Sequence, residues 1–268
     1  MKKDLKEICN IDVSIYDSVF FDKTLQARVV ANSIISEKNY FDYLSENNDE
    51  VEILKKALNN NFSEFFRNRL TFAYLEYIIL PELIQKKAKL KKKEIRIWTA
   101  ACASGQEAYS LAILCNELLK NQNTNMSFRI FATDISDTEI QKAKKGIYPE
   151  TALNNVTMKR VRENFEVKND AFVINKELKK LIDFSTFDLL DINTTSPQAS
   201  IFGSFDIVFC SNLLFYYNEK AQIQILDKVD ANLVPGGYLI VGEAEKSIIE
   251  RIKNYIWISK TSIFRKPK

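Results

Sequence analysis

Gly105 and Asp134 are the residues of this chain whose types and spacing could bind a nucleoside. Gly105 and Glu107 follow a short apolar run at residues 95–98 and open a helical pattern, in the stretch IRIWTAACASGQEAYSLAILCNELL. A strand that turns through small residues into a helix forms half of a βαβ nucleotide-binding unit. Because the turn lacks the further glycines of a dinucleotide motif, it favours a ligand with an adenosine and no phosphate there, such as S-adenosylmethionine. A purely structural strand–helix turn is the alternative.

Asp134 ends the next apolar alternating stretch, SFRIFATD, at residues 127–134. An acid at the end of the second strand of such a unit accepts hydrogen bonds from the ribose hydroxyls. The separation from Gly105 exceeds the usual spacing of about 20 residues, and a polar loop at residues 120–126 accounts for the excess. Asp134 could instead cap the next helix, and the two roles are compatible. We favour ribose binding.

Composition excludes several classes of chemistry. The chain of 268 residues has no histidine, which excludes serine–histidine and cysteine–histidine catalysis and argues against a metal site. Its four cysteines are scattered, so we expect free thiols in a reducing compartment: Cys9, Cys102, Cys115 and Cys210. A net charge of +3 does not by itself indicate a nucleic-acid partner. Without a long apolar run or a leader-like start, the chain is expected to be cytoplasmic and not membrane-inserted.

The elements that must position these residues alternate between strands and helices. Strands are predicted at residues 95–98, 127–134, 182–187, 205–210, 238–241, 256–259 and 262–264. Helical patterns between them predict an α/β fold with a doubly wound parallel sheet. A hairpin pattern at residues 165–174 interrupts the alternation, and we interpret it as a small inserted β subdomain.

The first 90 residues have helical patterns throughout. Asn59, Asn60 and Asn61 break the pattern, and Ser63 is predicted to start a longer helix that runs to about residue 84, with a kink or break at Pro81. A lysine-rich run, KKAKLKKK at residues 86–93, follows. We interpret it as a solvated linker and the domain boundary, the alternative being a patch for an acidic partner.

Several motifs occur in one order along nearly the whole chain: FSEFFRN (62–68), IWTAACASGQEAYSLA (97–112), FATDIS (131–136), AKKGIY (143–148), FDIVFCSNLLFYYN (205–218) and LVPGGYLIVGEAE (233–245). Together they resemble the CheR family, S-adenosylmethionine-dependent methyltransferases that esterify glutamate side chains of chemotaxis receptors. The resemblance implies an all-helical N-terminal domain over residues 1–90. It implies a Rossmann-like methyltransferase domain over residues 91–268, with a small antiparallel β insertion at about 160–180.

The resemblance also implies roles for single residues. The implied cofactor-binding set is Ser63, Arg67, Gly105, Glu107, Asp134, Asp188, Leu189, Asn212 and Leu213. In this set Glu107 holds the methionine ammonium group, Asp134 holds the ribose, and Asp188 with Leu189 flanks the adenine. Arg67 and Tyr216 are the implied catalytic residues, and Tyr216 faces the substrate.

The implied chemistry agrees with the absence of histidine. A carboxylate is already a nucleophile at neutral pH, so its attack on a sulfonium methyl group needs no general base. Such a site works by aligning the reacting atoms and replacing the water around them. Arg67 is suited to orient the incoming carboxylate through paired hydrogen bonds. A surface salt bridge is the alternative role for Arg67.

The chain departs from the family pattern at positions that bear on the substrate. Residues 23–30 keep only Lys23 and Arg28 where the family has several arginines, Ser211 replaces an arginine, and the family's Gly-His-Ser-Glu reads GEAE at 242–245. The expected partner is an acidic protein, the cytoplasmic methylation helices of chemoreceptors. Alternatives are a non-catalytic cofactor-binding regulator and a methyltransferase acting on a non-receptor target. A nucleic-acid methyltransferase is disfavoured, because residues 211–214 lack the Asn/Asp-Pro-Pro-aromatic motif.

Overall fold

The computed structural model describes residues 5–6, 11–90, 93–122, 126–200, 203–258 and 261–268. Parts of three sequence predictions lie outside these residues: positions 91–92 of the lysine run, 123–125 of the polar loop and 259 of a closing strand. Cys9 also lies outside them. The chain divides into two compact units, residues 1–61 with 214–224 and residues 62–213 with 225–268.

The first unit is built from short helices around a small apolar core. Its elements are η1 (Val13–Ile15), α2 (Ser18–Ala31), α3 (Glu37–Glu46), α4 (Asn48–Asn59) and η4 (Leu214–Tyr216), together with the start of α11 (Glu219–Asn232). The helices begin at side-chain caps, such as Asp17 accepting from the Phe20 N–H and Ser36 accepting from the Asn39 N–H.

A buried ion pair crosses the core of the first unit. Arg28 donates two hydrogen bonds, of 2.9 and 2.7 Å, to the carboxylate of Glu50, and the Tyr40 hydroxyl donates a third at 2.6 Å. Glu50 and Tyr40 are both buried. Of the two basic residues that the sequence keeps in 23–30, Arg28 is half-buried and paired with Glu50, and Lys23 is exposed.

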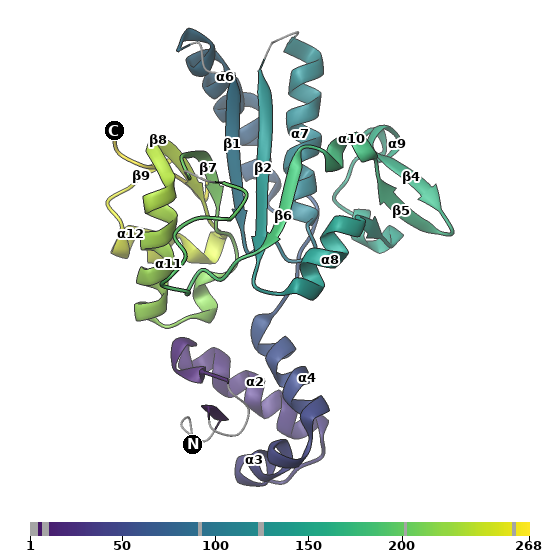
Figure 1. The fold of residues 1–268 in the computed structure, drawn as a ribbon, viewed down its shortest axis with the longest axis vertical. Coiled ribbons are helices and arrows are strands. Elements are labelled where there is room, and N and C mark those ends of the chain that lie inside the picture. The colour runs from purple at the N-terminus through teal and green to yellow at the C-terminus, as the bar shows by residue number, and fades with distance from the viewer. Residues whose placement is uncertain (1–4, 7–10, 91–92, 123–125, 201–202, 259–260) are drawn as a thin grey trace. The chain divides into compact units, whose positions relative to one another are not determined.

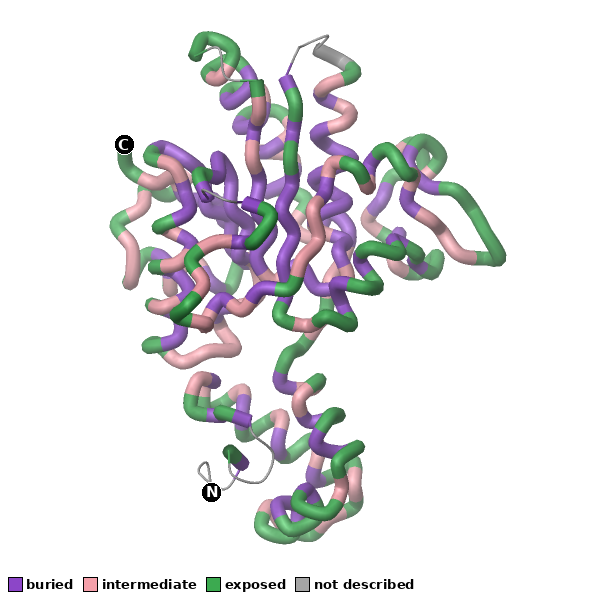
Figure 2. Tube along the Cα trace, in the orientation of Figure 1, coloured by how far each residue is buried: buried purple, intermediate pink, exposed green. Residues whose placement is uncertain are grey.

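The second unit contains a seven-stranded sheet with the order β6-β2-β1-β7-β8-β10-β9 (Figure 1). The strands are β1 (Glu94–Ala100), β2 (Ser127–Asp134), β6 (Ile182–Thr186), β7 (Phe205–Phe209), β8 (Leu233–Ile240), β9 (Ile256–Ile258) and β10 (Ile263–Arg265). The pairings from β6 to β8 are parallel, and β10 is antiparallel to both β8 and β9. The predicted Rossmann-like α/β class is confirmed, and its central strands are buried (Figure 2).

Helices of the second unit connect the strands and cover the sheet. They include α5 (Arg69–Tyr74), the π-helical segment η2 (Leu75–Ile79), α6 (Leu80–Lys89), α7 (Gln106–Gln122), α8 (Asp137–Lys145), η5 (Glu243–Glu245) and α12 (Lys246–Ile252). Pro81 is the second residue of α6, which follows the π-helical segment directly, so the predicted break is replaced by a change of helix type within one run.

The predicted helix start at Ser63 is wrong. Residues 60–64 are irregular and the helix begins at Arg69, where Asn68 caps it by accepting a hydrogen bond of 3.2 Å from the Thr71 N–H. Phe66 and Asn68 have positive φ angles, 49° and 65°, which no helix accommodates. Ser63 therefore lies in a loop.

The compact units divide at residues 61 and 62, whereas the sequence placed the domain boundary at the lysine run. The reason is packing: Phe65, Leu75 and Leu80 belong to the same buried cluster as Ile95 and Ile97 of β1. The lysine run is partly built into the fold as well. The ammonium of Lys87 lies 2.6 Å from the Asp206 carboxylate and 2.7 Å from the Glu94 carbonyl.

The inserted subdomain is a three-stranded antiparallel sheet, as the predicted fold class requires. Its strands are β3 (Ile147–Tyr148), β4 (Phe165–Lys168) and β5 (Ala171–Ile174), in the order β3-β5-β4. The helices η3 (Glu150–Leu153), α9 (Met158–Asn164) and α10 (Lys176–Lys179) flank these strands in the chain. The hairpin was predicted from sequence, and the third strand, β3, was not.

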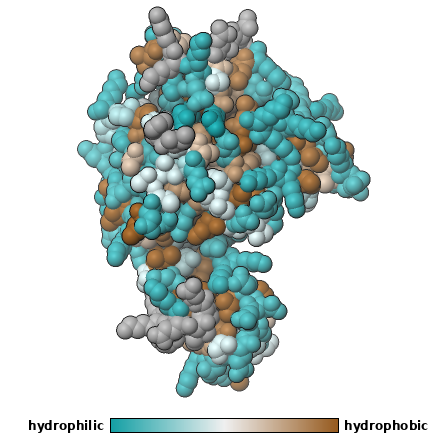
Figure 3. Space-filling model, viewed as in Figure 1, coloured by the Kyte–Doolittle hydropathy of each residue, from teal (hydrophilic) through white to brown (hydrophobic). Residues whose placement is uncertain are grey.

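Hydrophilic side chains predominate on the face shown in Figure 3, with apolar ones scattered among them. Among the helices described, none combines the length and the apolarity that a membrane span needs.

Candidate active site

The turn between β1 and α7 is shaped by three positive φ angles, at Ala101, Ala103 and Gly105. Gly105 has φ +90°, and a Cβ there would lie 2.8 Å from the Cβ of Ala143 in α8. Only glycine fits this combination of backbone and close approach. The turn thus brings the end of β1 and the start of α7 to one point at the carboxyl edge of the sheet, where α/β folds bind ligands.

Asp134 holds this turn from the end of β2. Its carboxylate accepts hydrogen bonds from the Ala103 N–H at 2.8 Å and from the Ser136 N–H at 2.9 Å. The alternative that Asp134 caps α8 is wrong, because Ser136 is the N-cap of that helix. Burial raises the pKa of Asp134, and the backbone donors oppose that shift. Ribose binding by Asp134 stays a prediction.

Glu107 stands in the first turn of α7 with its carboxyl inside a small cavity. Within the described residues it accepts no hydrogen bond. Burial, with a smaller contribution from the negative charge of Glu245, raises the pKa of Glu107 to about 8, although Arg67 lowers it. A half-buried acid that accepts no hydrogen bond from the described residues fits a cationic group of a ligand, such as the ammonium of a bound amino acid moiety.

The cavity around Glu107 is formed by three segments of the second unit. These are the loop before α5, the β1–α7 turn and the residues after β7, contributing Phe62, Ser63, Glu64, Arg67, Ala101, Cys102, Ala103, Glu107, Ser211 and Asn212. Four predicted site residues therefore line one cavity: Ser63, Arg67, Glu107 and Asn212. Gly105 and Asp134 shape its wall through the contacts described above.

The remaining predicted cofactor residues do not line this cavity. Asp188 and Leu189 follow β6, the neighbour of β2, and the Asp188 carboxylate accepts from the Leu190 N–H at 2.7 Å. Leu189 is buried. Leu213 adjoins Asn212 in the turn after β7. The adenine-flanking role of Asp188 and Leu189 stays a prediction.

Arg67 has no carboxylate partner among the residues that the structure describes. Its guanidinium carbon lies 5.3 Å from the centre of the Phe62 ring. The surface salt bridge, considered above as the alternative role of Arg67, is therefore absent from the described residues. A guanidinium left unpaired at a cavity mouth can bind an incoming carboxylate.

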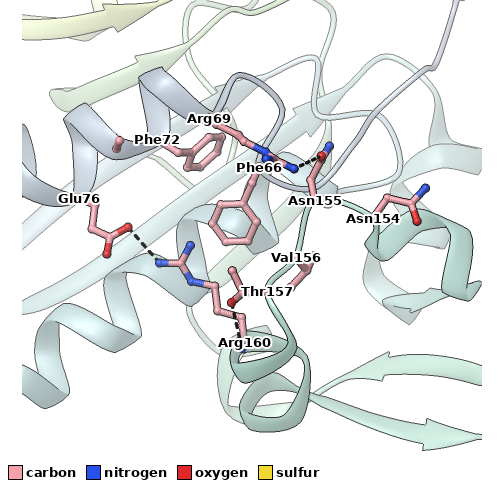
Figure 4. Close-up of a pocket in the computed structure, with 10 residues that line it drawn as sticks. Phe66, Arg69, Phe72, Glu76, Asn154, Asn155, Val156, Thr157 and Arg160 are labelled. Atoms are coloured by element: carbon pink, nitrogen blue, oxygen red, sulfur yellow. Dashed lines mark hydrogen bonds and ion pairs between the residues drawn. The ribbon is translucent and has the colours of Figure 1, made fainter.

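The loop that carries Arg67 is anchored by its neighbour Phe66. The Phe66 N–H donates to the Ser110 hydroxyl of α7 at 2.9 Å. The guanidinium of Arg160 lies over the Phe66 ring and donates to Glu76 at 3.0 Å and to Glu117 at 2.7 Å. Figure 4 shows Phe66 between Arg160 and Phe72 in a second cavity, which α5 and α9 line together.

Tyr216 belongs to the first unit. Its hydroxyl accepts a hydrogen bond from the Asn60 side-chain amide, and its ring centre lies 4.7 Å from that of Phe20. The substrate-facing role of Tyr216 stays a prediction.

Sequence reasoning missed two charged residues that hold the site's loops, Arg160 and Glu245. Glu245 ends the motif LVPGGYLIVGEAE, which contributed to the family resemblance, but no role was predicted for this residue. A signal was present, because an acid three residues after a helix N-cap often accepts a hydrogen bond from the N–H of that cap, and Glu245 has this spacing from Gly242. Arg160 sits in a polar segment without periodicity, and no sequence signal marks it.

No group of three or more potential metal ligands occurs among the described residues.

The family model "CheR methyltransferase, SAM binding domain" matches residues 61–262. A "Chemotaxis protein methyltransferase" of Borreliella burgdorferi is 27% identical over 238 residues, 88% of this chain and 82% of that protein. "Chemotaxis protein methyltransferase 1" of Pseudomonas aeruginosa is 33% identical over 72% of this chain and 69% of its own length. Its namesake in Vibrio cholerae is 34% identical, over 70% and 66% respectively.

Proposed function

This chain belongs to the CheR methyltransferase family, and from that membership we propose that it methylates glutamate side-chain carboxylates of a protein, with S-adenosylmethionine as methyl donor. The products are a glutamyl methyl ester and S-adenosylhomocysteine. The substrate we propose is the set of cytoplasmic methylation helices of a chemotaxis receptor, because the relatives are named as chemotaxis protein methyltransferases. The reaction then takes place in the cytoplasm.

The observation that supports this proposal is the meeting of Glu107 and Arg67 at one cavity. Glu107 offers a half-buried acid to a cationic amino acid moiety, and Arg67 offers to a carboxylate a guanidinium that has no acidic partner among the described residues. S-adenosylmethionine carries an ammonium, and the target glutamate carries a carboxylate. The two groups therefore match the two reactants of a carboxyl methylation.

In this proposal the chain's residues bind and align, and none of them takes a proton. When bound, S-adenosylmethionine supplies a methyl group on a positively charged sulfur. A glutamate oxygen forms the new bond to that methyl as the sulfur–methyl bond breaks, and the electron pair stays on the sulfur. Arg67 orients the carboxylate and excludes water from it. Glu107 and Asn212 hold the cofactor end of the site.

Transfer of labelled methyl groups into membranes of the native cell tests the proposal. Purified protein, labelled S-adenosylmethionine and receptor-containing membranes should give label on a receptor band that alkali releases as methanol. Label that resists alkali would place the methyl on nitrogen and contradict a carboxyl ester. Cofactor binding without any labelled product would contradict the catalytic proposal and support a regulator.

A further inference from the structure

Glu245 is a fully buried carboxylate beside the candidate site. It ends the short helix η5 after β8, and its exposed fraction is 0%. Acidic side chains are almost never buried to this extent unless their oxygens have strong partners. The partners of Glu245 therefore indicate what the residue does.

Three backbone N–H groups donate to Glu245. Those of Asn212 and Leu213 lie at 2.8 and 2.6 Å, and that of Gly242 lies at 2.5 Å. Bonds from backbone amides to an ionised carboxylate are short and about twice as strong as neutral ones. Two of the three donors belong to the turn after β7, whose Ser211 and Asn212 line the site cavity. Glu245 thus connects the ends of β7 and β8.

The turn that Glu245 holds is conformationally demanding. Asn212 has φ 59°, in the left-handed region that few residues other than glycine enter. Its side-chain amide donates to the Ser211 hydroxyl at 2.8 Å. Without an acceptor for the N–H groups of Asn212 and Leu213, this backbone would relax toward commoner angles. The surface that the turn presents to the cavity would then change.

Gly242 leaves room for the Glu245 carboxylate beside the turn at residues 211–213. A Cβ on Gly242 would lie 2.8 Å from the Glu245 carboxylate and 2.9 Å from the Asn212 side-chain oxygen. The carboxylate, the glycine and the turn are therefore packed as one assembly. The electrostatic effect of Glu245 also reaches the far wall of the cavity, where its negative charge raises the pKa of Glu107 while Arg67 opposes it.

We propose that Glu245 is a positioning residue of the cofactor site. Its carboxylate fixes the turn at residues 211–213 in the left-handed conformation that presents Asn212 to the cavity, and so sets the affinity for S-adenosylmethionine. The inference rests on the proposed function, because that function names the ligand. Glu245 is thereby added to the cofactor site as a residue that acts on the cavity only through the turn at residues 211–213.

Calorimetric titration with S-adenosylmethionine and with S-adenosylhomocysteine tests the proposal. Glu245→Gln keeps the shape of the side chain but turns an NH2 group toward backbone donors, and we expect affinity for both ligands to fall about tenfold or more. Glu250→Gln removes an exposed acid from α12 and is the matched control, with wild-type affinity expected. Titrations are made well below the melting temperature of each variant, so that a change in affinity is not a change in folding.

A double-mutant cycle shows whether Glu245 acts through the turn. If it does, Glu245→Gln combined with Asn212→Ala should bind about as weakly as the weaker single variant. Additive losses would overturn the proposal, as would wild-type affinity in Glu245→Gln. Should Glu245→Gln not fold, Glu245→Asp, which retains the charge with a shorter reach, replaces it. Wild-type affinity in Glu245→Asp would overturn the proposal, and a tenfold loss would support it.

The wild-type titration separates this proposal from the proposed function. Wild-type protein that binds neither ligand would contradict the function itself. Wild-type binding together with an unaffected Glu245→Gln variant would overturn only the role of Glu245.

Discussion

The guanidinium carbon of Arg160 lies 4.6 Å from the centre of the Phe66 ring, and Phe66 directly precedes Arg67. Arg160 comes from α9, next to the inserted β subdomain, and its two carboxylate partners come from η2 and α7. Three segments of the second unit, α9, η2 and α7, are thus joined behind the loop that carries Arg67. A cation over an aromatic face is attracted by the ring, and more strongly where water is excluded.

Replacing Arg160 should loosen this junction. Arg160→Met keeps an unbranched apolar stem but leaves Glu76 and Glu117 without their cation, and we expect stability to fall by about 2 kcal/mol. Urea unfolding measures the change. Arg162→Met, at an exposed position of the same helix, is the control and should unfold like the wild type. Equal free energies of unfolding in the two variants would show that the contacts of Arg160 contribute nothing to stability.

Glu107 makes cofactor binding depend on pH. With its pKa raised to about 8 by burial, the carboxyl of the free protein is mostly protonated at pH 7. Binding the ligand's ammonium requires the charged form, so affinity should rise with pH up to about 8, by at most about tenfold per unit. Calorimetry in two buffers of different ionisation enthalpy should also detect proton release on binding below that pH.

The stability of the free protein should change with pH in the opposite direction to cofactor affinity. An acid whose pKa is higher in the folded state than its model value of 4.5 binds a proton that the unfolded chain has lost, so stability declines as pH rises from about 4.5 to 8. Glu107→Gln cannot titrate and should flatten this part of the profile. A melting series at fixed ionic strength compares the two proteins. Identical slopes would contradict the raised pKa.

Much of the fold could be predicted from the sequence because local patterns and packing agree there. The strand that reads FDIVFC is apolar throughout, as a strand buried on both faces must be, and it is the fully buried β7. The loop that holds Ser63 and Arg67 could not be predicted in the same way. Its left-handed Phe66 and Asn68 depend on contacts with Ser110 and Ser262 from distant segments.

The site was predicted in part for the same reason. Motifs located Glu107 and Asn212, which line one cavity, because each follows a strand of the sheet. A run of lysines predicts exposure on average, whereas Lys87 reaches back to buried Asp206. Long-range partners of single charged residues are not encoded in local sequence.

Gly105→Ala should damage both stability and cofactor binding. The new Cβ would meet the Ala143 Cβ at 2.8 Å on a backbone with φ +90°, so strain and overlap add, and we expect a loss of about 3 kcal/mol. Gly236→Ala is the matched control: its φ is +74°, but the nearest atom to the added Cβ is 3.6 Å away. It should lose only about 1 kcal/mol. Chemical unfolding measures the loss of stability in each variant. An equal loss in the two would show that the contact of residue 105 with α8 is unimportant.

Tyr216→Phe tests the substrate-facing role implied for that residue. The variant removes the hydroxyl that accepts from the Asn60 amide, and we expect methyl transfer to receptor membranes to slow with cofactor affinity unchanged. Asn60→Ala removes the donor and keeps the hydroxyl. If only the bond between them matters, both variants slow equally; if the hydroxyl contacts substrate, Tyr216→Phe is slower. Wild-type rates in Tyr216→Phe would contradict a role for the hydroxyl.

Arg67→Ala should separate turnover from cofactor binding. Without a cation to orient the incoming carboxylate, we expect the rate of methyl transfer to fall about 100-fold or more. Because Arg67 lowers the pKa of Glu107, its removal should raise that pKa further, so cofactor affinity should weaken modestly at pH 7 and recover in alkaline buffer. Arg69→Ala, an exposed arginine whose side chain contacts Asn155, is the control. A variant that loses cofactor binding equally at every pH would show that Arg67 contacts the cofactor directly, and one that keeps full turnover would remove Arg67 from the reaction.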